Sequence, residues 1–298
     1  MPRTRTYGLD IDTIRFAQRV KQGSGTTILP EPLKQINKFV VGIKKLKLWD
    51  SMVCWPMRSI HNAGTGSTVY SLGGLTVSNG TMVNAPSWEQ RGLYFRPTSY
   101  INAINYPNYP YTYTGEEDGG FGLTIFSVVN PLGWLPNGTS RDLALLGGWT
   151  GRPILALTTG VGGGDTMYLQ KFCVAYNYTP LGGSYINNYM RIYGAPSVNT
   201  TYYKNNFFFA GYSPSSIRET CSFTVDDINR LNGTSSQPVL SYGILPTSPV
   251  QLRVGSVNAS TNGLISISAL INIPISTDTM QLIRNLYKRT LGIGLNLP

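Results

Sequence analysis

Apolar and polar positions in the first fifty residues recur with the period of a helix. The segment that follows Asp12 ends in Gly23-Ser-Gly25, and it predicts a short helix with Asp12 as its N-cap. After Pro30 and Pro32, apolar residues recur at three- and four-residue spacing while the lysines lie largely off that stripe. The stripe consists of Leu33, Ile36, Val40, Ile43 and Leu46. It predicts a helix over residues 32–48 that packs on the following domain, in preference to a free partner-binding helix.

From Trp49 onward the pattern changes to short β-rich runs separated by Gly, Pro and Asn. We expect strands in the ranges 68–72, 75–77, 92–95, 122–129, 143–146, 154–157, 167–176, 189–193, 206–212, 220–225, 252–257 and 264–273. Crossover helices that would join parallel strands are missing from this pattern. The sequence therefore favours a closed or two-layer antiparallel architecture.

A final helical pattern begins at Ser276 or Thr277. Asp278 lies in its first turn, and Lys288 and Arg289 lie in its last, an order that complements the helix dipole. Its apolar stripe consists of Met280, Ile283, Leu286, Tyr287 and Leu291. We expect this helix to dock on the sheet and to return the C-terminus close to the N-terminal helices.

These patterns divide the chain into a basic helical arm, residues 1–49, and a β-sandwich with a docking helix, residues 50–298. The formal net charge is +10, and residues 1–50 hold ten Lys or Arg against four Asp or Glu. The arginines of this segment are interspersed with acidic and apolar residues rather than forming a run. They are Arg3, Arg5, Arg15 and Arg19. A solvated helix face or an acidic protein partner is therefore preferred over nucleic acid.

Cysteine usage and hydropathy indicate the cellular compartment in which the protein is made. Cys54, Cys173 and Cys221 are too few and too scattered for a disulfide framework, so we expect reduced thiols and synthesis in a reducing cytosol. The first thirty residues lack the apolar core of a signal peptide, and no run approaches the length of a membrane-spanning helix. We expect no membrane insertion.

Several motifs occur together in an order that resembles a known group of proteins. The segment 36–52 reads INKFVVGIKKLKLWDSM, the strand at 121–130 reads FGLTIFSVVN, and the block FFFAGY at 207–212 is followed by LNG at 231–233. With the two strands and the helix at the C-terminus, they resemble bacteriophage and metagenomic virion proteins that carry a concanavalin A-like, laminin G-like domain. The resemblance covers most of residues 33–292. It implies an all-β, concanavalin A-like jelly-roll sandwich and a virion structural or adhesive role, and it carries no catalytic residue across.

The search for catalytic chemistry returns little. The chain lacks the clustered carboxylates on one strand that glycan-cleaving relatives of this fold use. Its acidic cluster at 116–118 lies in a glycine-flanked turn. The single histidine, His61, has no nucleophile motif beside it. The glycine-rich segment 160–165 lacks the Lys-Ser/Thr of a phosphate loop. One His and three distant Cys offer no zinc ligand pairs. We expect no catalytic residue, no metal and no cofactor.

The best candidate for binding is a tyrosine-rich loop. It contains Tyr106, Tyr109, Tyr111 and Tyr113, separated by Pro, Asn and Thr. Amphipathic rings on a stiff loop can stack on sugars or pack in a protein interface. A loop folded over its own sandwich, or used in oligomer contacts, is the alternative.

The sequence therefore predicts a non-enzymatic virion structural protein of a tail, fibre or capsid surface, made in the host cytoplasm. Its expected partners are other virion proteins, further copies of itself and a candidate cell-surface glycan, bound through many weak contacts. Two alternatives remain open. One is a small capsid protein that uses its basic arm on nucleic acid, and the other is a glycan-cleaving enzyme of the same fold, which the missing carboxylate pair disfavours.

Overall fold

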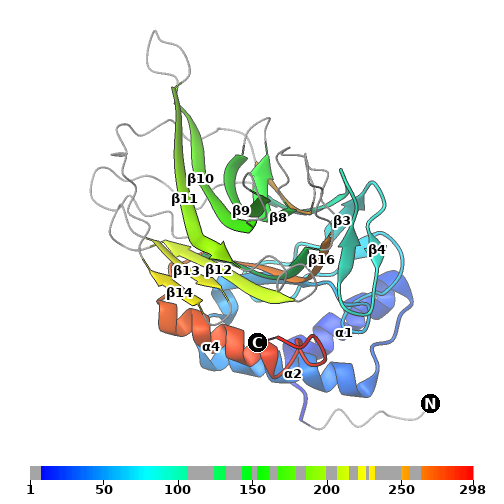
Figure 1. Ribbon diagram of the computed structural model, residues 1–298. Coiled ribbons are helices and arrows are strands. Elements are labelled where there is room, and N and C mark those ends of the chain that lie inside the picture. Colours follow the sequence, from blue (N-terminus) through cyan, green and yellow to red (C-terminus); the bar gives the residue numbers. More distant parts are fainter. Residues whose placement is uncertain are drawn as a thin grey trace, which may run out of the picture.

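Two β-sheets and a layer of helices make up the part of the chain that the structure describes (Figure 1). The computed structural model describes residues 8–106, 124–131, 143–149, 153–161, 167–178, 186–198, 207–214, 221–225, 228–231, 250–255 and 263–297. The helical segments are α1 (Ile11–Ser24), α2 (Pro30–Lys45), the 3-10 turn η1 (Trp49–Ser51) and α4 (Thr277–Lys288). The strands are β1 (Met52–Pro56), β2 (Thr68–Val69), β3 (Gly80–Val83), β4 (Ser87–Trp88), β5 (Leu93–Phe95), β6 (Tyr100–Tyr106), β7 (Thr124–Pro131), β8 (Leu143–Trp149), β9 (Pro153–Val161), β10 (Met167–Tyr178), β11 (Ile186–Val198), β12 (Phe208–Pro214), β13 (Cys221–Val225), β14 (Ile228–Leu231), β15 (Val250–Gly255) and β16 (Gly263–Ile271).

The strands form two antiparallel sheets. Sheet A has the order β14-β13-β12-β7-β16-β5-β4, and β1 also pairs with β16. Sheet B has the order β11-β10-β9-β8-β15-β6-β3-β2. The prediction of a two-layer antiparallel architecture with few helices is confirmed at this level.

Sheet A is the middle layer of the molecule. Helices α1, α2 and α4 cover one of its faces, and sheet B lies on the other side (Figure 1). The central strand β16 is therefore buried along its whole length. Two of its serines find partners inside: Ser266 Oγ lies 2.7 Å from the Tyr287 hydroxyl, and Ser268 Oγ lies 2.8 Å from Ser127 Oγ. Each buried hydroxyl is thus satisfied, as burial requires.

The two sheets approach each other closely near Gly255. This residue has a φ of 112°, a conformation that favours glycine, and a Cβ added to it would lie 2.6 Å from Cε1 of Phe95 in sheet A. Trp55 of β1, which is fully buried, donates from its indole nitrogen to the Ser78 carbonyl at 2.7 Å. The sandwich core is therefore built from large rings set against small residues.

Helix α2 occupies most of the range in which a helix was predicted. Ile36, Val40 and Ile43 are buried as expected, whereas Leu33 is only half-buried because it lies in the first turn. Phe39, which the predicted stripe omitted, is fully buried and contacts Tyr287 of α4 edge-to-face, with 6.5 Å between ring centroids.

The C-terminal helix is confirmed with its predicted start. Ser276 is the N-cap of α4, and its side chain accepts a hydrogen bond from the backbone of Thr279 at 3.1 Å. Met280, Ile283 and Tyr287 are buried against sheet A and α2, so the helix docks as expected.

Two predicted details are wrong. The N-cap of α1 is Asp10 rather than Asp12, because Asp10 accepts from the Asp12 backbone at 2.9 Å while the Asp12 carboxylate turns to Lys44. The range 75–77 forms no strand. Its first amide, that of Leu75, donates instead to the Met52 carbonyl at 3.1 Å, a single bond that starts no ladder.

None of the helices in the described part of the chain combines the length and the apolar character needed to cross a bilayer.

Candidate binding face

The predicted tyrosine loop begins at one end of sheet B. Tyr106 is the last residue of β6, and it pairs with the first residue of β15. The other three tyrosines, Tyr109, Tyr111 and Tyr113, lie outside the described residues. The chain resumes with β7, whose first residue pairs with the last residue of β16. Tyr106 thus ends a strand of sheet B, and the next described residue, Thr124, begins a strand of sheet A.

Further aromatic residues reach the same end through strand register. Trp149 is the last residue of β8 and pairs with Pro153, the first residue of β9. Strands β10 and β11 continue past this point as a hairpin that projects from the sheets in Figure 1, with Tyr176 and Tyr178 near its end. The sequence predicted strands at 167–176 and 189–193, and it missed only that these strands extend to Tyr178 and begin at Ile186. The spacing of the two tyrosines, two residues apart on a strand, was the available signal.

The outer face of sheet B, turned away from sheet A, is defined by burial along β15. Leu252 and Val254 are buried, while Arg253 between them is partly exposed on the opposite face. Its guanidinium lies 4.6 Å from the ring centroid of Tyr100 on β6. This contact is a cation–π arrangement, which holds the arginine over the sheet.

Register extends this outer face across the sheet. Arg253 pairs with Gly147 of β8, Gly147 with Ala156 of β9, Ala156 with Phe172 of β10, and Phe172 with Arg191 of β11. Residues directly opposite one another in an antiparallel sheet share a face. The register therefore aligns these five positions in one row across the sheet, with Arg253 as the member whose side chain is described.

The single histidine is a buried structural group. His61 is 1% exposed, and its Nε2 lies 2.7 Å from Gln35 Oε1, so Nε2 must carry the hydrogen. Burial, together with the nearby charge of Arg58, lowers the pKa of His61 to about 3. A ring that is neutral, enclosed and already paired is not available to a substrate in this structure.

Arg58 beside it fastens the C-terminal segment. Its guanidinium donates to the carbonyls of Leu291 at 2.7 Å, Ile293 at 2.8 Å and Gln90 at 3.1 Å. Only 5% of the residue is exposed, and burial lowers the pKa of Arg58. The Arg58 guanidinium therefore binds backbone carbonyl oxygens of the protein itself.

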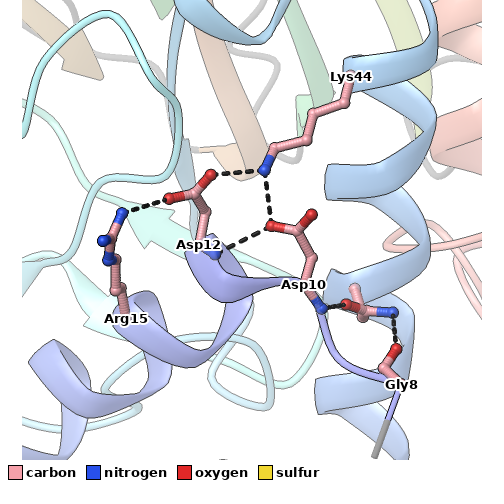
Figure 2. A network of polar contacts seen from close by, with 6 residues as sticks. Gly8, Asp10, Asp12, Arg15 and Lys44 are labelled. Carbon is pink, nitrogen blue, oxygen red and sulfur yellow. Dashed lines mark hydrogen bonds and ion pairs between the residues drawn. The ribbon is translucent and has the colours of Figure 1, made fainter.

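A network of charges joins α1 to α2 (Figure 2). Lys44 Nζ lies 2.7 Å from Asp10 Oδ1 and 2.6 Å from Asp12 Oδ2, and Arg15 contacts Asp12 at 3.3 Å. Burial would raise the pKa of Asp12, but hydrogen bonds and charge from Lys44 and Arg15 outweigh it and lower that pKa. Burial likewise opposes the Lys44 charge, yet both aspartates together raise its pKa. The two carboxylates are therefore engaged in holding the helices together.

The described residues contain no group of three or more His, Cys, Asp or Glu that could hold a metal ion. Cys54 is a buried free thiol, and burial raises its pKa. The side chains of the other two cysteines, and the acidic cluster at 116–118, lie outside the described residues.

No family model and no curated protein matches this chain. Solved structures do match it. One is a botulinum neurotoxin type C described as entering cells through interaction with two ganglioside molecules, with a TM-score of 0.52 and 8% identity over 81% of this chain and 53% of that one. A second is the binding domain of botulinum neurotoxin DC in complex with SialylT, with a TM-score of 0.52 and 9% identity over 80% of this chain and 52% of that one. A third is the same kind of domain in complex with rat synaptotagmin II, with a TM-score of 0.51 and 8% identity over 80% and 52% of the two chains.

This chain spans about half the length of each of these structures. At such low identity the likeness concerns the fold, so the ligands of those proteins are not assigned to this chain. The shared feature is a β-sandwich of two antiparallel sheets.

Proposed function

We propose that this protein is a non-enzymatic structural component of a bacteriophage or virus particle, in a tail, a fibre or the capsid surface, assembled there after synthesis in the host cytoplasm. Its sandwich is of the concanavalin A-like jelly-roll type. It contacts neighbouring virion proteins, further copies of itself or a cell-surface glycan through the outer face of sheet B and the end that carries Tyr106.

One observation carries this proposal. Sheet A is covered on both faces, by helices on one side and by sheet B on the other, so its central strand is buried throughout. Sheet B, by contrast, has an outer face with the partly exposed Arg253 held over Tyr100, and its end leads into the tyrosine loop. We therefore assign recognition of glycans and protein partners to the outer face of sheet B. Sandwiches of similar fold that are named for ganglioside, SialylT or synaptotagmin II complexes support a binding role.

Three features support a role without catalysis. His61 is enclosed and paired with Gln35. Asp10 and Asp12 are both bound to Lys44. The described residues hold no metal-binding cluster.

A glycan array and a self-association measurement test the binding role together. The wild-type chain is compared with the double variant Tyr109→Ala, Tyr111→Ala, with Arg253→Gln, and with Leu282→Ala as a control. Leu282 is 51% exposed on α4, on the other side of the molecule. Loss of interface rings should weaken glycan binding or oligomer formation by about 1–3 kcal/mol, with circular dichroism and melting temperature nearly unchanged. The control should bind as wild type.

Two results would overturn this reading. If the tyrosine variant unfolds and the wild type neither binds any glycan nor self-associates, the tyrosines are core residues. If any bound glycan is cleaved on prolonged incubation, the protein is an enzyme.

The virion assignment has its own test. Mass spectrometry of purified particles from the source culture should find this chain in a fixed ratio to the major capsid protein. Its absence from washed particles would exclude a structural role.

A further inference from the structure

The outside of the helical layer carries a concentration of positive charge that the candidate binding face does not use. Within residues 8–51 and 276–297, eight Lys or Arg side chains are exposed, against three exposed carboxylates, Glu31, Asp50 and Asp278. The eight are Arg15, Lys21, Lys34, Lys38, Lys45, Lys47, Lys288 and Arg289. The sequence alone showed a basic N-terminal segment whose charges are interspersed with other residues. Folding of α1, α2 and α4 onto one face of sheet A gathers them on one side (Figure 1).

Helix α2 presents the most regular part of this surface. Lys34, Lys38 and Lys45 fall within about 40° of one another around the helix axis and span about 16 Å along it, by standard helix geometry. Lys34 is paired weakly with exposed Glu31 at 3.5 Å. Lys44 of the same helix does not belong to this row. Figure 2 shows that its ammonium group turns to Asp10 and Asp12, which neutralise its charge.

The character of this surface favours one class of partner. Protein interfaces are depleted in lysine and are centred on buried aromatic or arginine anchors. On these helices every aromatic side chain is buried, namely Phe16, Phe39 and Tyr287. Six of the eight exposed cations are lysines, which act as flexible point charges and suit a regular array of phosphates that requires no exact fit.

We propose that the outer surface of the helical layer binds the phosphate backbone of nucleic acid without reading its sequence. A duplex carries roughly ten phosphates, counting both strands, along about 16 Å of its axis, which is more than the three lysines of α2 need. The outer face of sheet B lies on the opposite side of the molecule (Figure 1). In a particle, the helices would then face packaged nucleic acid while sheet B faces outward.

Fluorescence anisotropy with a labelled 30-nucleotide single strand and the matching duplex tests this proposal on the full chain between 50 and 200 mM salt. The variant is Lys38→Gln, Lys45→Gln. The matched control is Arg91→Gln, Arg96→Gln, which removes the same charge from exposed positions at the β4–β5 turn and after β5. Labelled poly-L-glutamate serves as an acidic polypeptide probe.

We expect saturable binding to either DNA whose dissociation constant rises about tenfold in the α2 variant and less than twofold in the control. The slope of log affinity against log salt should fall by about 1.8 for the duplex and about 1.4 for the single strand, because two phosphate contacts are lost. Equal weakening in both variants, or no binding at 50 mM salt, would overturn the proposal. So would poly-L-glutamate binding as tightly as DNA with the same dependence on Lys38 and Lys45, since the surface would then be one for acidic proteins.

Discussion

Mild acid should destabilise this protein through one residue. His61 is the single histidine of the chain, and burial, together with the charge of Arg58, holds it neutral inside the fold. Its pKa is about 3 in the folded state and 6.5 when exposed. Between these values the unfolded chain binds a proton that the folded chain excludes. Stability is therefore complete above about pH 6.5 and is lost as the pH falls toward 3.

The size of the effect follows from linkage. Moving from pH 7.5 to pH 5 should lower the free energy of unfolding by about 2 kcal/mol, from the ratio of the two protonation functions. This change in the free energy of unfolding is nearly the same for any pKa of His61 below about 4.5 in the folded state. At pH 5 it is set mainly by protonation of His61 in the unfolded chain. Side-chain carboxylates titrate mainly below this window.

Urea unfolding followed by tryptophan fluorescence at pH 7.5, 6.5, 5.5 and 5.0 measures the slope. The variant His61→Gln keeps a donor toward Gln35 but cannot titrate, so its stability should change by less than about 0.5 kcal/mol over the same range. Proton NMR of the lone imidazole gives an independent check, since its resonance should not titrate above pH 5 while the protein is folded. A wild-type stability that is flat across the window, or an equal slope in the variant, would refute the reasoning.

Two further substitutions probe packing and the C-terminal latch. Gly92→Ala should cost about 2 kcal/mol, because its added Cβ would lie 2.6 Å from the Ile265 carbonyl oxygen; an unchanged denaturation midpoint would contradict this. Arg58→Met should cost about 3 kcal/mol and open residues 289–297 to amide exchange and proteolysis, because the carbonyls of Leu291 and Ile293 lose their donor. Protection of that segment equal to wild type would show that the latch is dispensable.

The helices and the long strands were predictable because their patterns are strong and local. α4 carries its cap, its dipole-complementing charges and its apolar stripe within thirteen residues. Strand β16 was predicted within two residues at each end from the sequence GLISISALI. The cap of α1 was misplaced because two aspartates compete for it, and the choice depends on Lys44, thirty-four residues away from Asp10.

Other features depend on contacts that one sequence does not reveal. Strand β6 was missed because YINAINY interrupts its apolar residues with Asn, and only its pairing with β15 and β3 defines it. The row that includes Arg253 and Arg191 exists only through the register of intervening strands. The basic surface was visible in part, since six of its eight cations lie in the first fifty residues; Lys288 and Arg289 join them only because α4 docks beside α2.

The central position of β16 bears on how the chain is made. Strand β1 (Met52–Pro56) pairs with β16, which is synthesised more than two hundred residues later. Strand β7 also pairs with β16. At ordinary translation rates this interval is roughly 10–40 s. During it, the apolar faces of α1 and α2 and the edges of β1 and β7 lack their last partner. Assembly of the middle layer is then a late and strongly non-local event, which slows folding. We expect expression yield to depend on chaperone capacity during this interval more than on the stability of the finished protein.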